Sequence, residues 1–257
     1  MQDSPLEAAP PAAFDPGLIL FAAAIIGLGA QNILSAKDVT QLMGPGYGVI
    51  PVLPYLPSIA WLAYVLGVVW VVLGAGLLFR RTLLPSALAL GIILVLCAVI
   101  VAVPRNAANF GDVGLRTSVF EPLAMASLAW LLPGVAAIPR FLALAARWIF
   151  AVSLVIFGID HFLVLQFIAS LVPSWLPWHV FWSAFFGIAF IAAGIGIALN
   201  FLARSSYAGI ALMFGIWVLT LHLPRVLHAL HNADEWSSFF IALSLWGGSW
   251  AAARKPS

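Results

Sequence analysis

The sequence predicts an all-α polytopic membrane protein, with eight transmembrane helices arranged as two parallel four-helix repeats. Three observations support this prediction: the apolar composition, apolar segments that recur along the whole chain, and a match between the two halves at a fixed offset. Of the 257 residues, 64% are hydrophobic and only 8% are charged, whereas soluble domains carry about 25% charged residues. Lipid is therefore the expected solvent for most of this chain.

The composition and motifs exclude several classes of function. The 11 Lys and Arg residues are dispersed and form no basic run, so nucleic-acid binding is not expected despite a pI near 9.0. Cys97 is the only cysteine, which rules out an intramolecular disulfide, a CxxC redox pair and a cysteine-ligated iron–sulfur cluster. No HExxH zinc motif, phosphate loop or nucleophile–base pair is recognisable, so no metal site is predicted and enzymatic activity stays open.

The first half of the chain contains four apolar segments near the length that a transmembrane helix needs, about 20 residues. The first follows residues 1–16, which have no basic n-region, so a retained helix is expected rather than a cleaved signal peptide. The second ends before Arg80, the third before Pro104, and the fourth is short and stops at Pro133. The predicted spans are Gly17–Ser35, Pro57–Phe79, Leu83–Val103 and Ser118–Leu132.

The second half contains four further segments of the same kind. They are uniformly apolar and do not alternate between polar and apolar residues, which argues against a strand barrel. Arg140 precedes the first of them, Arg204 separates the second from the third, and Glu235 precedes the last. The predicted spans are Phe141–Phe167, Trp178–Leu202, Ser205–Leu223 and Trp236–Ala253.

Residues of the two halves match without gaps when Pro57 is paired with Pro177, an offset of 120 residues. The same offset pairs Leu56 with Leu176, Gly67 with Gly187, Gly74 with Gly194, Gly76 with Gly196, Pro104 with Pro224 and Arg105 with Arg225. Such a match indicates a duplication, and the glycines are expected to let helix backbones approach closely. An even number of spans in each half makes the repeat parallel. The predicted units are a tail over 1–16, a scaffold repeat over 17–139 and a second repeat over 140–253.

The distribution of positive charge predicts the orientation in the membrane. Cytoplasmic loops carry the excess of Lys and Arg in membrane proteins. One side of the predicted bundle has Arg80, Arg81, Arg140, Arg147, Arg204, Arg254 and Lys255, and the other has Lys37, Arg105, Arg116 and Arg225. Both termini are therefore expected in the cytoplasm, and the expected location is the bacterial inner membrane.

Polar residues of the second half gather toward the predicted extracytoplasmic side. Asp160 and His161 lie in the outer part of one span, and His222 and Arg225 lie at the outer end of another. A charge within a span costs about 2.5–3.5 kcal/mol on the insertion scale. Asp160 is therefore expected to face the bundle and to pair with Arg225, in a structural tie between helices, a functional role, or both.

These residues suggest a candidate ligand site made of Asp160, His161, Trp175, His179, His222 and Arg225. Tryptophans near a membrane interface are usually anchors, but with a few polar groups they also make an apolar slot that suits a quinone or small amphiphile. His161 and His222 are an alternative axial pair for a b-type haem, or ordinary hydrogen-bonded histidines. The first half has Asn32 and Ala102 near the matching positions, so the chemistry is expected to belong to the second half.

The second half contains the segments FGIDHFL (Phe157–Leu163), VPSWLP (Val172–Pro177), GIAFIAAGIGI (Gly187–Ile197), WVLTLHLPRV (Trp217–Val226) and the pair Glu235-Trp236. Through these segments, residues 146–250 resemble the DoxX-like integral membrane proteins. Some members of that family are subunits of quinone-reducing thiosulfate oxidation systems or of oxidoreductase assemblies, and the family provides no agreed catalytic residues. This chain differs by fusing two units.

The resemblance implies an accessory subunit of a membrane redox complex, with other membrane protein subunits as partners and a quinone- or lipid-like ligand. An alternative is a purely structural or assembly subunit, which the lack of a complete catalytic constellation favours. Transport of a small solute is a third hypothesis, and it ranks last because no pair of broken midplane helices is recognisable in matching positions.

Overall fold

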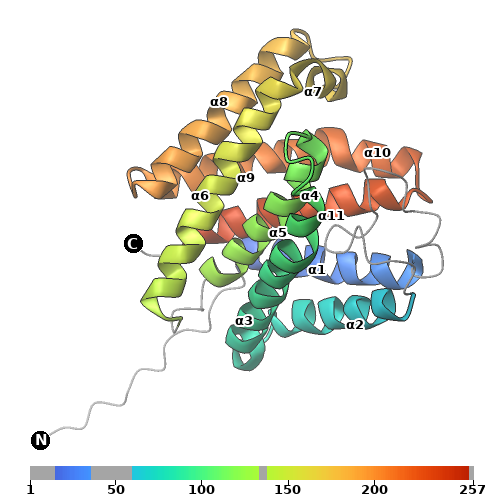
Figure 1. Cartoon of the computed structure of the whole chain (residues 1–257), viewed down its shortest axis with the longest axis vertical. Helices are drawn as coiled ribbons and strands as arrows, with labels where there is room; N and C mark the ends of the chain where they lie inside the picture. The colour runs from blue at the N-terminus through green and yellow to red at the C-terminus, as the bar shows by residue number, and fades with distance from the viewer. Residues whose placement is uncertain (1–14, 36–59, 133–137, 255–257) are drawn as a thin grey trace, which may run out of the picture.

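The computed structural model describes residues 15–35, 60–132 and 138–254, and every regular element in these ranges is helical (Figure 1). Two short π-helical segments, η1 and η2, continue α3 and α9. Features predicted on the remaining residues, among them Lys37, Pro57 and Lys255, lie outside the described residues. The elements are α1 (Pro16–Ser35), α2 (Ala60–Gly76), α3 (Arg80–Leu96), η1 (Cys97–Ala102), α4 (Val103–Asn106), α5 (Val113–Leu131), α6 (Arg140–Leu163), α7 (Leu165–Leu171), α8 (His179–Ala198), α9 (Ala203–Trp217), η2 (Val218–His222), α10 (Leu223–His228) and α11 (Ala233–Arg254). The prediction of an all-helical membrane protein is confirmed in this coarse form.

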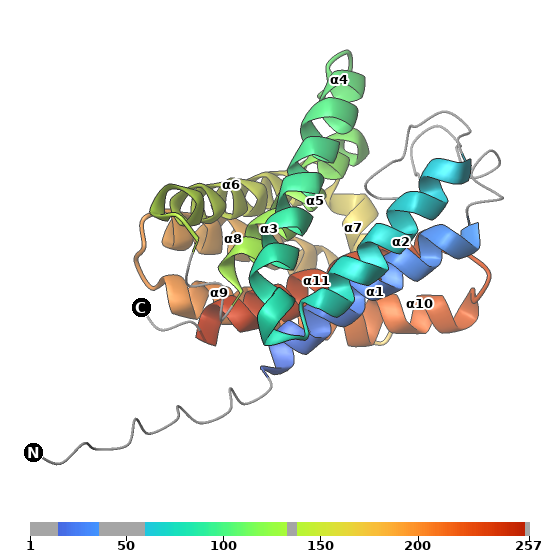
Figure 2. The same ribbon diagram turned by 90° about the horizontal axis from the view of Figure 1, so that it is seen from below.

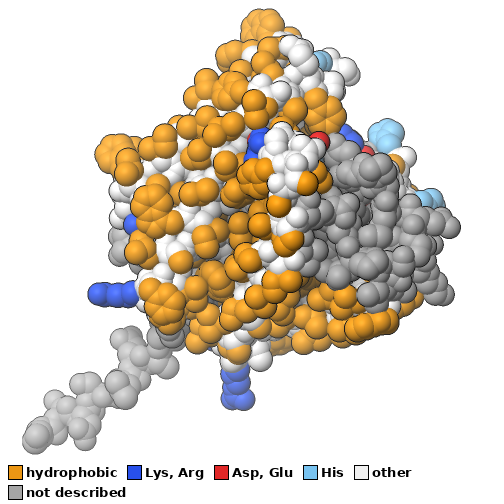
Figure 3. All heavy atoms as spheres, viewed as in Figure 1, with side chains coloured by type: hydrophobic (Ala, Val, Ile, Leu, Met, Phe, Trp, Pro, Cys, Tyr) orange, Lys and Arg blue, Asp and Glu red, His pale blue; other side chains and the backbone are white. Residues whose placement is uncertain are grey.

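Five helical runs among the described residues are long and apolar enough to cross a membrane. They are Pro16–Ser35, Arg80–Ile100, Arg140–Leu163, His179–Ala198 and Ala203–His228. α2 is apolar but shorter, and α5 and α11 are outside this set. Hydrophobic side chains also cover most of the described surface in Figure 3, with few charges between them. An apolar exterior of this kind suits a lipid bilayer and would be unfavourable in water.

The helix boundaries differ from the predicted spans at two places that affect the site. α5 begins at Val113 rather than Ser118, because the carboxylate of Asp112 accepts a hydrogen bond from the amide of Leu115 at 2.9 Å and caps the first turn. Arg116 therefore lies in a helix and not in a linker. α6 ends at Leu163, and the following α7 is a separate short helix.

A π-helical segment precedes a proline at matching positions of the two halves. η1 is followed by Pro104 in α4, and η2 is followed by Pro224 in α10. Proline has no amide hydrogen and its ring collides with the carbonyl four residues earlier in a regular α-helix. Widening the preceding turn to a π-helix avoids this collision while the helical run continues.

Close helix contacts also recur between the halves. A Cβ atom on Gly29 of α1 would lie 2.6 Å from the carbonyl oxygen of Gly67 in α2, and one on Gly158 of α6 would lie 2.6 Å from that of Gly187 in α8. Only glycine allows backbones to approach this closely. The pairs α1–α2 and α6–α8 therefore pack in the same way, and each pair lies side by side in Figures 1 and 2.

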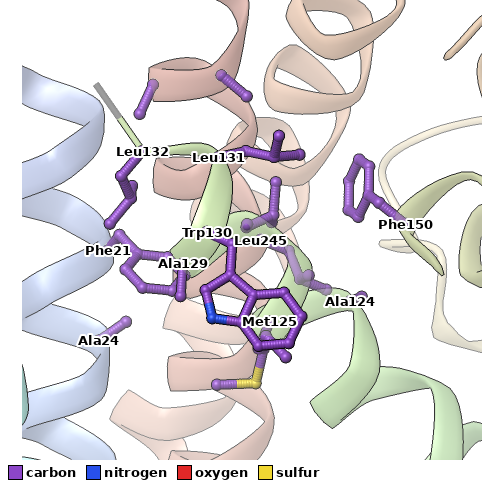
Figure 4. Close-up of a cluster of buried hydrophobic side chains, with 14 of the residues drawn as sticks. Phe21, Ala24, Ala124, Met125, Ala129, Trp130, Leu131, Leu132, Phe150 and Leu245 are labelled. Carbon is purple, nitrogen blue, oxygen red and sulfur yellow. The ribbon is translucent and has the colours of Figure 1, made fainter. Parts of the chain in front are cut away.

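The helices follow a closed order of neighbours: α1, α2, α3, α5, α6, α8, α9, α11 and α1 again. The last long helix of each half thus packs against the first helix of the other half, α5 on α6 and α11 on α1, and α5 also contacts α11. The core between the halves contains Phe21 of α1, Met125 and Trp130 of α5, Phe150 of α6 and Leu245 of α11 (Figure 4). The two halves are consequently interlocked.

Candidate ligand chamber

A cavity of about 550 Å³ lies among helices of both halves. Its walls come from α5 of the first half and from α6, α7, α8, α9, η2 and α11 of the second. Much of the wall is aromatic, from Phe157, Phe167, Phe190, Phe214 and Trp217. A helix of the first half supplies one wall, so the cavity is not confined to the second half, and the scaffold role of the first half stays a prediction.

Asp160 forms a buried ion pair with Arg116 at the edge of this cavity. The Nε atom of Arg116 donates to Oδ1 of Asp160 at 2.8 Å, and a second guanidinium nitrogen contacts the same oxygen. The guanidinium also donates to the carbonyl of Phe110 at 3.1 Å, and the hydroxyl of Thr117 lies 3.4 Å from Oδ2 of Asp160. The side chains of the pair are only 10% and 5% exposed.

The predicted pair of Asp160 with Arg225 is therefore wrong. Arg225 instead makes a two-point ion pair with Glu235, with nitrogen–oxygen distances of 2.8 and 2.6 Å. The early start of α5 brings Arg116 alongside α6, whereas Arg225 on α10 faces the first turn of α11. The prediction paired the two residues because both were expected near the same side of the membrane, and such a similarity does not show which helices are neighbours.

His161 lies beside Asp160 and is held in one orientation. Its Nδ1 is 2.8 Å from the carbonyl oxygen of Phe157, its ring stacks on Trp217 with centroids 5.7 Å apart, and Phe190 meets it edge-on. The residue is 8% exposed, it lines the cavity, and its Nε2 atom has no hydrogen-bond partner. A carbonyl oxygen can only accept, so Nδ1 carries the hydrogen and Nε2 of the neutral ring is an acceptor.

Other polar atoms on the cavity wall are also without partners. Nδ1 of His222 and Oδ1 of Asp234 are buried and unpaired. The carboxyl group of Glu121 lines the cavity from α5 and makes no hydrogen bond or ion pair with any described residue. Asp234 lies in the first turn of α11, outside the predicted spans. Burial raises the pKa of its carboxyl group, and the neighbouring carboxylate of Glu235 raises it further.

The structure brings together only some of the predicted site residues. Asp160, His161 and His222 line the cavity, but Trp175, His179 and Arg225 do not. Trp175 is 69% exposed, as expected for an interface anchor. Glu121 was missed as a site residue, although a carboxylate inside the predicted span Ser118–Leu132 is the kind of residue that marks a functional position in membranes.

The alternative of a haem held by His161 and His222 stays a prediction. Both side chains line the cavity, and each has one buried ring nitrogen without a partner. Within the described ranges, no group of three or more His, Cys, Asp or Glu side chains is placed to hold a metal ion.

No protein family, curated protein or solved structure that was compared with the chain matches it. The resemblance to the DoxX-like proteins therefore stays a prediction, and the functional argument depends on the chamber itself.

Proposed function

We propose that this chain is a membrane-embedded accessory subunit of a redox complex whose chamber binds a quinone- or lipid-like molecule. The observation that carries the proposal is the buried, unpaired Nε2 of His161, which lines a cavity whose wall is partly aromatic. A buried polar atom without a partner costs about 1–3 kcal/mol. A ligand that forms a hydrogen bond with this atom removes that cost. Ligand binding would therefore explain why the nitrogen has no partner within the protein.

The size and chemistry of the chamber support this class of ligand. Its volume of about 550 Å³ lies within the usual range of small-molecule sites, about 300–1,000 Å³, and such sites combine apolar walls with a few polar groups. A quinone head group is a flat ring with two oxygen atoms at opposite edges. Rings such as Phe190, Phe214 and Trp217 provide stacking surfaces for it, and Nε2 of His161 can accept a hydrogen bond from one of these oxygen atoms when it carries a hydrogen.

The proposal includes the finer membrane arrangement. It takes the eight long helical units as transmembrane, with both termini in the cytoplasm and the chamber toward the extracytoplasmic side of a bacterial inner membrane. Support comes from the chain direction: Arg140 and Arg204 begin α6 and α9, while Asp160 and His222 lie near the opposite ends of these helical runs. The resemblance of residues 146–250 to the DoxX-like proteins supports membrane protein partners.

Binding of a short-chain quinone to the protein in phosphatidylcholine nanodiscs tests the proposal. We expect one decylubiquinone or decylubiquinol molecule per chain above the amount that partitions into empty discs. Ala242→Phe fills the chamber wall and should weaken binding at least about tenfold, since Ala242 is a buried lining residue. Leu212→Phe is the control, because Leu212 is 67% exposed and does not line the cavity.

Two outcomes would contradict the proposal. One is binding of neither redox form beyond partition into lipid. The other is equal binding by the Ala242→Phe and Leu212→Phe proteins when both are folded, because a quinone bound elsewhere would not sense the chamber.

A further inference from the structure

We infer that the chamber prefers the reduced, hydroquinone form of its ligand over the oxidised quinone, because Nε2 of His161, the unpaired ring nitrogen whose hydrogen-bonding role the geometry fixes, is an acceptor. This inference rests on the proposed function and adds which redox form is held and by which residues. His161 and Glu121 are the two acceptors that we assign to the hydroxyl groups. Neither residue is needed for a covalent step, so the inference concerns binding alone.

The state of His161 decides the direction of one hydrogen bond. Its Nδ1–H is already donated to the carbonyl of Phe157 at 2.8 Å. In the neutral ring the remaining nitrogen, Nε2, carries a lone pair and no hydrogen. It can accept from a hydroxyl group, whereas a quinone carbonyl placed against it would put two acceptors face to face.

Glu121 lies on the face of α5 that is directed to the same space. It is one helical turn from Thr117, whose hydroxyl is 3.4 Å from Asp160, the neighbour of His161 in sequence. Both Thr117 and Glu121 line the cavity. The two acceptors therefore come from adjacent helices, α5 and α6, of different halves.

Three side-chain donors beside the chamber, those of Arg116, Thr117 and Ser118, are engaged elsewhere. Arg116 donates to Asp160 and to the carbonyl of Phe110. The hydroxyl of Thr117 is 2.8 Å from the carbonyl of Val113, and that of Ser118 is 2.6 Å from the carbonyl of Leu115. The exposed hydroxyl of Ser238 can donate or accept and does not discriminate between the two forms. A hydroquinone has two O–H donors for Nε2 of His161 and a carboxyl oxygen of Glu121, whereas a quinone has none to offer either residue.

Preference for one redox form has a thermodynamic consequence. If the reduced form binds more tightly, the reduction potential of the bound couple must rise relative to the free couple, because binding and reduction are linked. For a two-electron couple a tenfold preference corresponds to about 30 mV. The bound molecule would then be held as quinol beside a redox partner.

An organic cation is the competing occupant, since aromatic rings and carboxylates also bind ammonium groups. The carboxylate of Asp160, the neighbour of His161 in sequence, is already neutralised by Arg116. The imidazole ring of His161, which contacts the rings of Phe190 and Trp217, is uncharged and offers an acceptor nitrogen. These two facts favour the neutral hydroxyl donor.

The test compares decylubiquinol with decylubiquinone under anaerobic conditions, on the full chain in phosphatidylcholine nanodiscs. We expect the quinol to bind about tenfold more tightly and the bound couple to titrate at a correspondingly higher potential. His161→Phe retains an aromatic ring but removes the acceptor, so it should weaken quinol binding about five- to tenfold and leave quinone binding unchanged. His161→Gln, with an amide oxygen as acceptor, should restore part of the difference.

His228→Phe is the matched control for the histidine variants. His228 also contacts the carbonyl four residues earlier through Nδ1, at 2.7 Å, but it is exposed and does not line the cavity. The inference is overturned by equal affinities for the two forms, by tighter binding of the quinone, or by tetraethylammonium displacing the quinol while His161→Phe has no effect. Absence of binding by both forms would instead contradict the proposed function. If the variants fail to fold, the reduction potential of the couple bound to the wild-type protein still tests the inference, because a potential that is not higher than that of the free couple overturns it.

Discussion

The ion pair of Arg116 and Asp160 ties α5 of one half to α6 of the other, and both side chains are almost completely buried. Removing two charges from water is costly, and their attraction repays that cost only when the geometry is good and the remaining hydrogen-bonding positions are filled. Here the carbonyl of Phe110 accepts a further hydrogen bond from Arg116, and the hydroxyl of Thr117 lies near the second carboxylate oxygen of Asp160. Breaking the pair from one side would leave an unneutralised charge in the bundle.

Replacing one partner should therefore cost much more than replacing both. We expect Arg116→Met or Asp160→Leu alone to lower the free energy of unfolding by about 3–5 kcal/mol, and the double variant by less than about 2 kcal/mol, because it leaves no charge behind. Unfolding in mixed micelles with increasing dodecyl sulfate measures these changes. Arg225→Met is the control, since its half-exposed pair with Glu235 should contribute at most about 1 kcal/mol. Additive effects of the two single substitutions would show that the residues are not coupled.

Glycine contacts determine how closely neighbouring helices approach. A Cβ on Gly158 would meet both the carbonyl of Gly187 at 2.6 Å and the side chain of Ile191 at 2.6 Å. The first of these is backbone and cannot move alone. Because α6 carries Asp160 and His161 just beyond Gly158, the spacing of α6 and α8 also sets the position of the chamber wall.

Gly158→Ala should force α6 and α8 apart and lower the free energy of unfolding by about 1–3 kcal/mol. Gly209→Ala is the matched control in a helix, because a Cβ on exposed Gly209 would meet nothing within 4 Å. That substitution should be neutral or stabilise by about 0.5–1 kcal/mol through the loss of backbone freedom in the unfolded chain. Thermal unfolding of both variants in the same detergent provides the comparison, and equal melting temperatures would refute the close contact.

At the scale of the whole molecule, each half is closed by a helix of the other. α11 packs on α1 through Gly17 and Gly247, where a Cβ on Gly247 would lie 2.5 Å from the amide nitrogen of Phe21. α5 packs on α6 and supplies Glu121 to the chamber. A half on its own would expose both of these contact faces.

Two fragments, made by dividing the chain between Leu132 and Ile138, should therefore associate when they are produced together. We expect an affinity tag on one fragment to recover the other at equal stoichiometry, measured after size-exclusion chromatography. Gly247→Leu should reduce this recovery because its side chain would overlap the backbone of α1, whereas the exposed Leu212→Ala should not. Fragments that purify as separate folded monomers would contradict the interlocked arrangement.

Local patterns in the sequence were sufficient for the helical class, for the placement of the apolar segments, and for the position of Asp160, His161 and His222 near one another. Hydropathy and the matched Pro104 and Pro224 are properties of short stretches, so they can be recognised without knowing which helices are neighbours. The widening of the helix into η1 and η2 before these prolines was not predicted.

Only the tertiary structure decided the partners: Arg116 rather than Arg225 for Asp160, Glu121 as a further wall residue, and the exchange of α5 and α11 between the halves. Lipid tails are as apolar as the helix surfaces, so hydropathy does not select one helix neighbour over another. That choice depends on close packing at glycines and on a few buried polar contacts, which form between residues far apart in the chain. The sequence by itself therefore determined the apolar, all-helical class and where the polar groups of the second half gather, and the packing determined which of them line the chamber.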